Sequence, residues 1–162
     1  PAGLNGLELR RNFKHERQHQ CRRAIERIQA AGIRVNACFV LGLDGQGPWV
    51  FEAVRDFVRE TLPFDVQITV PTPFPGTPFY ELLKREGRLL QDGAWERCTL
   101  FDVNYRPRGM SVDQLRAWLH RLAVELYGED FTRERREHFK RTGTKRRHRQ
   151  PASESREAGA LY

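Results

Sequence analysis

Two short loops, each of which follows an apolar run, hold the residues best suited to bind a ligand. Residues 42–47 (GLDGQG) follow the run VNACFVL at 35–41, and residues 71–77 (PTPFPGT) follow the alternating segment FDVQITV at 64–70. In folds built from repeated strands and helices, ligands bind at the loops after the carboxyl ends of the strands. Two such loops in succession therefore predict one ligand-binding edge.

The side-chain types that carry out most enzyme chemistry are not grouped in this sequence. Cys21, Cys38 and Cys98 lie far apart and form no CxxC or CxxxCxxC pattern, and neither loop carries a nucleophile or a P-loop. We assign no metal-ligand role to the five histidines: His15, His19, His120, His138 and His148. We therefore predict a binding surface without catalytic or metal-ligating residues. Cys38 lies mid-strand, and we expect it to be a small buried hydrophobe.

The elements that must position the two loops alternate between helix and strand. Residues 14–31 have helical periodicity, and their apolar stripe consists of Cys21, Ala24, Ile25, Ile28 and Ala31. Residues 33–41 are almost continuously apolar, which is typical of a strand covered on both faces. A second helix over 50–62 leads into a strand over 64–70. This order predicts a parallel βαβ unit with a right-handed crossover.

The strand at 64–70 alternates strictly between apolar and polar residues, with Phe64, Val66, Ile68 and Val70 on the apolar face. In a barrel that encloses a polar ligand, Gln67 and Thr69 would face the lumen. A half-exposed edge strand explains the same pattern equally well, because periodicity assigns faces and not ligands. Both interpretations stay open at this point.

Helical elements dominate the second half of the sequence. A short helix is expected to end near Arg85, and Ser111 with Gln114 forms a capping box that opens a long helix. Gly128 then gives a natural break before a charged helix over 130–140. We expect Trp95 and Trp118 to be core residues. From residue 142 onward the composition has too few apolar residues to order itself.

The net charge of +7 is concentrated near the C-terminus. Residues 1–132 hold 18 Lys and Arg against 17 Asp and Glu, whereas residues 133–162 hold ten against four. A solvated charge run is the default interpretation of such a tail, and contact with nucleic acid is the alternative. No run of about 18 apolar residues and no secretory signal is visible. Since the cysteines also offer no disulfide framework, we expect a cytoplasmic protein.

Four phrases occur in one order: GIRVNACFVLGLDG at 32–45, PTPFPGTPFYELLKREGRLL at 71–90, Trp95, and RPRGMSVDQL at 106–115. Together they resemble the C-terminal half of radical S-adenosylmethionine (SAM) enzymes of the cobalamin-binding type. The resemblance implies an α/β fold, namely a partial (β/α) barrel fragment with a helical C-terminal extension. Residues 1–90 would form the last barrel units, residues 91–141 the extension, and residues 142–162 a disordered basic tail.

The resemblance also implies which residues lie against SAM. The first strand and its loop would contact the adenosine, and the second loop would close over the adenine edge; the implied contacts are Val40, Gly42, Asp44, Thr72, Pro73 and Gly76. Gln46 stands where many radical SAM proteins carry a glutamate. The [4Fe–4S] cluster and cobalamin are expected only in a full-length parent, because the CxxxCxxC motif is absent here.

Three functions are compatible with the sequence. The first is a fragment of a cobalamin-dependent radical SAM enzyme, inactive alone, whose parent acts on a small molecule by methyl transfer or rearrangement and whose N-terminal half is either lost or separately encoded. The second is a small α/β module whose basic tail contacts nucleic acid. The third is a decayed or structural protein with no partner. Independently of these three, Gly42, Gly45 and Gly47 can serve a tight turn and not a ligand, because only glycine adopts a positive φ without strain. Half a barrel leaves a strand edge unpaired at residues 34–41, so we predict that this polypeptide alone is poorly soluble or oligomeric.

Overall fold

The computed structural model describes residues 19–147, and describes side chains as far as residue 143. A helix spans residues 19–30. The elements that follow are β1 (Asn36–Val40), α2 (Trp49–Thr61), β2 (Asp65–Thr69), α3 (Pro78–Arg85), a 3₁₀ turn (Trp95–Arg97), α4 (Val112–Tyr127) and α5 (Glu129–Arg147). None of the helices in this part of the chain is long and apolar enough to cross a membrane.

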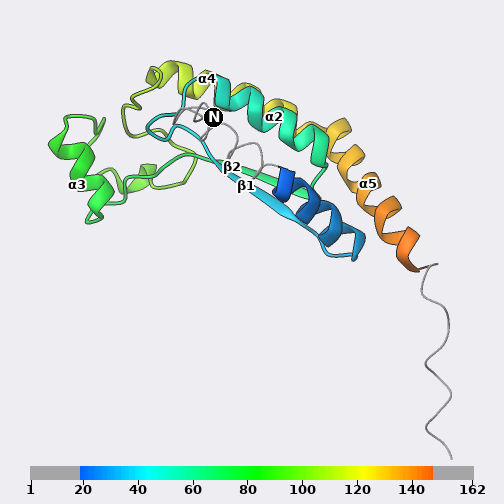
Figure 1. The fold of residues 1–162 in the computed structure, drawn as a ribbon. Coiled ribbons are helices and arrows are strands. Elements are labelled where there is room, and N and C mark those ends of the chain that lie inside the picture. Colours follow the sequence, from blue (N-terminus) through cyan, green and yellow to red (C-terminus); the bar gives the residue numbers. More distant parts are fainter. Residues whose placement is uncertain (1–18, 148–162) are drawn as a thin grey trace, which may run out of the picture.

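Strands β1 and β2 form a parallel pair whose register runs from Asn36 opposite Asp65 to Val40 opposite Thr69. Helix α2 connects them, so the predicted βαβ unit and the α/β class are confirmed. Helices α2, α4 and α5 lie together on one side of the strands (Figure 1). Among residues 19–147 the sheet has only these two strands, so the structure does not extend to a barrel.

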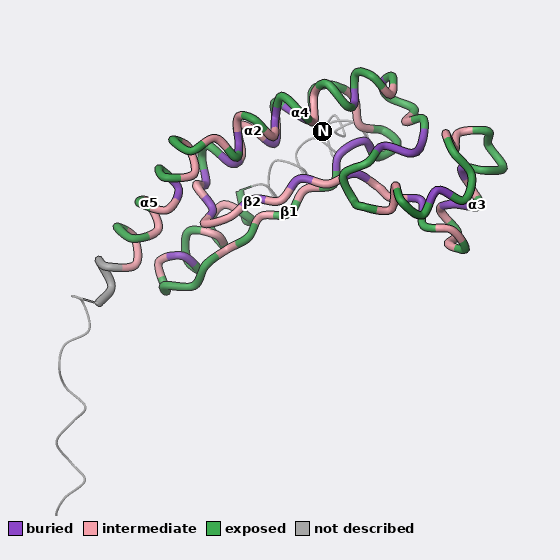
Figure 2. Tube along the Cα trace, turned by 180° about the vertical axis from the view of Figure 1, so that it is seen from behind, coloured by how far each residue is buried: buried purple, intermediate pink, exposed green. Residues whose placement is uncertain are grey.

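The two faces of this sheet differ in what covers them. Val66 and Ile68 of β2 are buried under the helices, which confirms the predicted alternation of this strand. On the opposite face Asn36, Cys38 and Val40 of β1 are exposed (Figure 2). The predictions that residues 33–41 are covered on both faces and that Cys38 is buried are therefore wrong. The apolar composition of a strand does not show how many of its faces are covered, and among residues 19–147 helices cover one face only.

Helices α2 and α4 supply most of the core. The rings of Phe51 and Trp118 stack with their centroids 5.9 Å apart, and Val58, Leu115 and Leu126 are fully buried. Trp118 thus packs on the core as predicted. Trp95 does not, because it lies in the 3₁₀ turn with 65% of its surface exposed.

The helix of residues 19–30 confirms the predicted helix over 14–31 as far as the structure describes it. Residues 14–18 lie outside the described residues. This helix packs through polar residues, since buried Gln29 donates from Nε2 to the Leu62 carbonyl at 3.2 Å and Arg22 pairs with Glu60. Its apolar stripe stays exposed: Cys21, Ala24, Ile28 and Ala31. The sequence pattern located this stripe but did not reveal that nothing in the described chain covers it.

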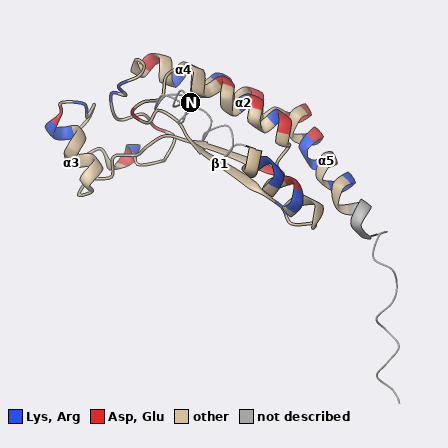
Figure 3. Cartoon of the chain, in the orientation of Figure 1, with Lys and Arg blue, Asp and Glu red and all other residues tan. Residues whose placement is uncertain are grey.

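The C-terminal helices begin where the sequence predicts and end later. Ser111 and Gln114 form the predicted capping box, and Gly128 separates α4 from α5. Helix α5, which carries charges of both signs along its length, continues to Arg147 (Figure 3). The prediction of disorder from residue 142 is therefore wrong for residues 142–147, while residues 148–162 lie outside the described part. Charged residues such as Lys and Arg are good helix formers, so a helix can extend past its last core contact.

The outer edge of β2 carries protein acceptors in place of a third strand. The Ile68 amide donates to the Tyr127 hydroxyl at 3.1 Å, and the Val70 amide donates to the Leu100 carbonyl at 2.8 Å. Tyr127 belongs to α4, so the extension closes this side of the sheet.

Tyr127→Phe tests this closure, because it removes the acceptor of the Ile68 amide. We expect the protection of that amide against hydrogen exchange to fall roughly tenfold, while the free energy of unfolding falls by only about 1 kcal/mol because water can replace the hydroxyl. Hydrogen exchange followed by NMR measures the amides of Ile68 and Val70 in the same experiment. The Val70 amide is the internal control, and an equal loss of protection there would contradict the assignment.

Candidate ligand-binding site

The two predicted loops lie next to each other at the carboxyl end of the strands. The parallel ladder continues one step beyond β1, where the Leu41 amide donates to the Thr69 carbonyl at 2.8 Å. Residues 42–47 and 71–77 therefore leave the sheet from adjacent positions. The structure thus brings together the two groups of sequence-predicted site residues, Val40–Asp44 on one loop and Thr72–Gly76 on the other.

The side chain of Gln46 organises the first loop. Its Oε1 accepts hydrogen bonds from the amides of Gly42 at 2.8 Å and Leu43 at 3.0 Å, and its Nε2 donates to the Val40 carbonyl at 3.3 Å. One amide side chain therefore satisfies three backbone groups of the turn. This role requires both an acceptor and a donor, and a glutamate could supply only the acceptor.

The side chains packed around residue 42 leave no room for a residue larger than glycine. Gly42 has a φ of +91°, and an added Cβ would overlap the Tyr105 hydroxyl and lie 2.9 Å from Leu115. Its carbonyl accepts from that hydroxyl at 2.8 Å. Since its amide is bonded to Gln46, both polar groups of Gly42 have partners within the chain. These contacts favour the interpretation that Gly42 serves a tight turn. Gly42 would then contribute to a site through the shape of the loop and not through its own polar groups.

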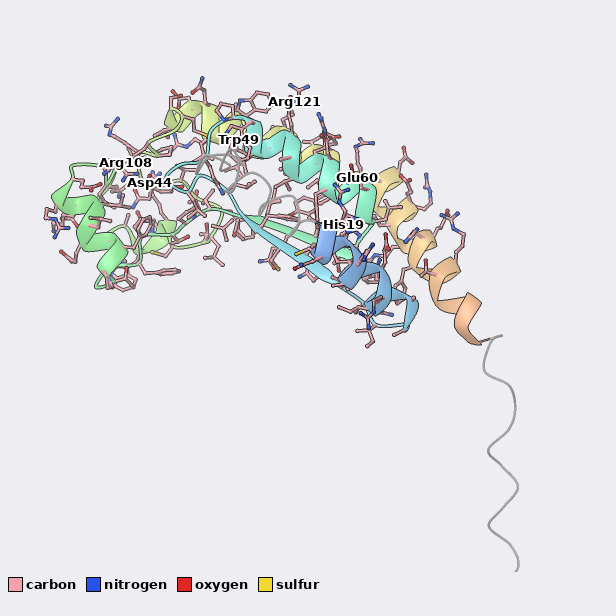
Figure 4. All side chains as sticks on the ribbon, viewed as in Figure 1. His19, Asp44, Trp49, Glu60, Arg108 and Arg121 are labelled. Carbon is pink, nitrogen blue, oxygen red and sulfur yellow. The ribbon has the colours of Figure 1, made fainter. Side chains whose placement is uncertain are left out.

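Asp44 lies in a cluster of two carboxylates and two guanidinium groups (Figure 4). Arg88 donates to its two carboxylate oxygens at 2.6 and 2.9 Å, and Arg108 lies 3.3 Å away. Glu86 pairs with the same two arginines, each at 2.9 Å. The hydrogen bonds from Arg88 hold the pKa of Asp44 below its ordinary value. The carboxylate is thus already neutralised inside the chain.

The second loop is a rigid turn closed by threonine side chains. Thr77 caps α3 by accepting from the Tyr80 amide, and its hydroxyl donates to the Phe74 carbonyl at 2.7 Å. The Thr72 hydroxyl donates to the Val70 carbonyl at 3.4 Å. Pro73 is buried, while Gly76 is exposed with nothing within 4 Å of its Cβ position. Of the three residues predicted on this loop, Pro73 supports the turn, and Thr72 and Gly76 lie at its surface.

Exposed apolar side chains accompany both loops, and of these only Val40 was predicted from the sequence. Val40 and Leu43 are each 45% exposed, and Phe74 is 38% exposed. Leu100, whose carbonyl meets the end of β2, is also exposed, as is Phe101 beside it. Their position within or beside the strand-end loops was the signal that could have identified the others.

Metal-binding groups are not assembled in residues 19–147, where no three His, Cys, Asp or Glu side chains lie close enough to share an ion. Cys21 is on the first helix, Cys38 is in β1 and Cys98 follows the 3₁₀ turn. The charged groups beside the first loop, namely Asp44, Glu86, Arg88 and Arg108, are paired with one another.

A family model described as a domain of unknown function (DUF4070) matches residues 77–161, which is just over half of the chain. The chain belongs to this family. Over 96 residues it is also 27% identical to the bacteriochlorophyllide d C-12(1)-methyltransferase of Chlorobaculum tepidum. The aligned stretch covers 59% of this chain and 20% of the methyltransferase, so the chain spans about a fifth of that relative's length.

Gly42→Ala and Gly45→Ala form a matched pair of variants, because the two glycines have φ values of +91° and +87°. A methyl group at residue 45 enters open space, whereas one at residue 42 overlaps Tyr105. We expect Gly42→Ala to lower the free energy of unfolding by about 2 kcal/mol more than Gly45→Ala does. Urea denaturation followed by circular dichroism measures both, and equal losses would contradict the close packing at Gly42.

Because Tyr105 is buried, we expect the free energy of unfolding to fall at high pH. Burial, followed by the negative charge of Asp44, raises the pKa of Tyr105 above its ordinary value of 10.0. Its neutral form is favoured in the folded chain, so the stability it contributes is complete below pH 10 and falls above it as the unfolded chain ionises. We expect the wild type to lose up to about 1.4 kcal/mol per pH unit more than Tyr105→Phe above this point.

The measurement is the difference in urea midpoint between pH 8 and pH 11 for both proteins. Lysine titration affects both proteins alike and cancels in the comparison. Parallel pH profiles for wild type and Tyr105→Phe would show that Tyr105 is not the buried, neutral donor to Gly42.

Proposed function

We propose that this chain is the C-terminal part of a cobalamin-dependent radical SAM enzyme and supplies one wall of the pocket for SAM. The parent enzyme would act on a small molecule. Its reaction would be methyl transfer, which the similarity to the Chlorobaculum tepidum methyltransferase favours, or a radical rearrangement. The four sequence phrases that resemble such enzymes include both loops of the site.

The observation that carries this proposal is the one-sided sheet. Helices cover the face with Val66 and Ile68, while the face with Cys38, Gln67 and Thr69 has no layer of helices over it among residues 19–147. A wall of a (β/α) barrel has this organisation, with helices outside and a partly polar surface inside. It fits the lumen interpretation of Gln67 and Thr69 better than the edge-strand interpretation, because β2 has its outer edge closed by Tyr127 and Leu100.

The groups at the loops suit the adenosine part of SAM. Val40 offers an exposed apolar surface on which a purine face can lie, and Gly76 leaves room for close approach of the backbone. The Thr72 hydroxyl is near the surface of the same edge. Asp44 would act indirectly, since its charge is held by Arg88. When bound in an enzyme of this class, SAM supplies a methyl group or a 5′-deoxyadenosyl radical.

The [4Fe–4S] cluster does not fit the residues present, and cobalamin is expected only in the full-length parent. The three cysteines belong to separate elements, and their spacing in the sequence is not that of a cluster-binding loop. In the proposed parent, both groups would be held by residues outside these 162.

Binding of S-adenosylhomocysteine to the ¹⁵N-labelled chain tests the proposal. NMR detects millimolar binding, so a partial pocket suffices. We expect the amide shifts that change on titration to cluster at residues 40–46 and 71–77. Val40→Glu should weaken binding roughly tenfold, because it places an unpaired carboxylate against the purine.

Val124→Glu is the matched control, since Val124 lies on α4 and is 63% exposed. It should bind S-adenosylhomocysteine as the wild type does. Shift changes elsewhere in the chain, or equal weakening by both variants, would refute a SAM site at these loops.

A further inference from the structure

The two outer edges of the sheet differ in their capacity to accept another strand. On β2, the outward-facing amides of Ile68 and Val70 are bonded to Tyr127 and Leu100. On β1, no strand lies against the outer edge within residues 19–147. Among residues 19–147, the sheet can therefore be extended on the β1 side alone.

The register identifies the backbone groups on that open edge. The Val35 carbonyl accepts from Asp65 at 3.0 Å and the Leu41 amide donates to Thr69 at 2.8 Å, so odd-numbered residues of this segment face β2. Asn36, Cys38 and Val40 consequently point their amides and carbonyls outward. The Val40 carbonyl receives a 3.3 Å bond from Gln46 at the end of the strand, which marks where the edge stops.

An apolar surface flanks the same edge. Both ribbon views place the helix of residues 19–30 on the β1 side of the sheet (Figures 1 and 2). A surface pocket with a volume of about 590 Å³ is lined by Ala24, Ile28 and Ala31 of this helix together with Ile33, which is 59% exposed. A strand edge alone buries less area than the roughly 1,200 Å² typical of the smaller stable interfaces, and this surface adds apolar area beside the edge.

We propose that two copies of this chain associate through the outer edges of β1 to form a four-stranded sheet of order β2-β1-β1-β2. The inference concerns the 162-residue chain itself and does not depend on the proposed function. A two-fold axis makes the central strands antiparallel, and full overlap of Asn36–Val40 places the axis at Cys38.

A second copy of this chain is the partner that fits the outer edge of β1. The edge needs a partner strand whose own amides and carbonyls are open, and β1 of another copy is such a strand. Because the β2 edges are closed by Tyr127 and Leu100, association ends at two copies and does not continue into a fibre. The two-fold arrangement sets the Cys38 residues opposite each other as a hydrogen-bonded pair, with Cα atoms about 5.5 Å apart.

Oxidative cross-linking tests the register directly. Cα atoms about 5.5 Å apart are within disulfide range, so diamide should take two electrons and two protons from the paired Cys38 thiols and leave a covalent dimer. We expect this dimer on non-reducing gels for the wild type, Cys21→Ser and Cys98→Ser, and its loss in Cys38→Ser. Cross-linking that depends on Cys21, which is also exposed, would overturn the proposed interface.

Sedimentation velocity tests the association without oxidation. Cys38→Lys sets two ammonium groups opposite each other at the axis, and we expect it to weaken the dimer at least roughly tenfold. Gln67→Lys is the matched control, because Gln67 lies opposite Cys38 on the same face of β2. Its two copies would be about 14 Å apart, beyond the screening length of about 8 Å at 0.15 M salt.

The proposal therefore requires a dimeric wild type, a dimeric Gln67→Lys and a largely monomeric Cys38→Lys. A monomeric wild type, or a Cys38→Lys protein that dimerises as the wild type does while its circular dichroism is unchanged, would overturn it. Assemblies larger than dimers in the wild type would contradict the closure of the β2 edge.

Discussion

The contact between Tyr105 and Gly42 fixes the end of β1 against the C-terminal extension, and the geometry of the site depends on it. Tyr105 is almost fully buried, donates to the Gly42 carbonyl at 2.8 Å and packs edge-to-face on Phe79 of α3. The next residue, Arg106, accepts from Arg88 through its carbonyl at 2.8 Å. Because Arg88 also holds Asp44, one stretch of the extension anchors the first loop at two places.

This anchoring determines what the site can offer a ligand. The backbone groups of the first loop are bonded to Gln46 and Tyr105, and the carboxylate of Asp44 is paired with Arg88. Interactions already made inside the chain are not available without breaking them, and breaking them leaves buried polar groups unsatisfied. What remains exposed is apolar surface such as Val40 and Leu43. Such a surface suits the flat face of a neutral ring, whereas charged parts of a ligand would need partners elsewhere.

Sequence periodicity predicted the elements whose pattern is local. The alternation around Val66 and Ile68, the capping box at Ser111 and the break at Gly128 each follow from residues a few positions apart. The two loops of the candidate site were found for the same reason, since each follows an apolar run. Their adjacency then required only that the strands be parallel neighbours.

Local patterns missed the features that depend on distant parts of the chain. Gly42 and Tyr105 are 63 positions apart, and Asp44 and Arg88 are 44 apart, so no short motif announces either contact. Cys38 and Trp95 were expected in the core, yet their exposure depends on how many layers surround them. Residue type gives the tendency to be buried, but the number of neighbouring elements decides the outcome.

The C-terminal segment that anchors the site also contains Leu100 and α4, which determine the side on which the sheet can gain another strand. Tyr127 and Leu100 accept from the outward amides of Ile68 and Val70, while within residues 19–147 no strand pairs with the outer edge of β1, which lies beside an apolar helix surface. Open strand edges are rarely left exposed in stable proteins, because they invite pairing. In a longer polypeptide of the proposed class, a preceding strand would occupy this edge, and in the chain alone a second copy would do so. The proposed dimer thus follows from an asymmetry between the two edges, which arises because α4 and the Leu100 segment close the β2 side.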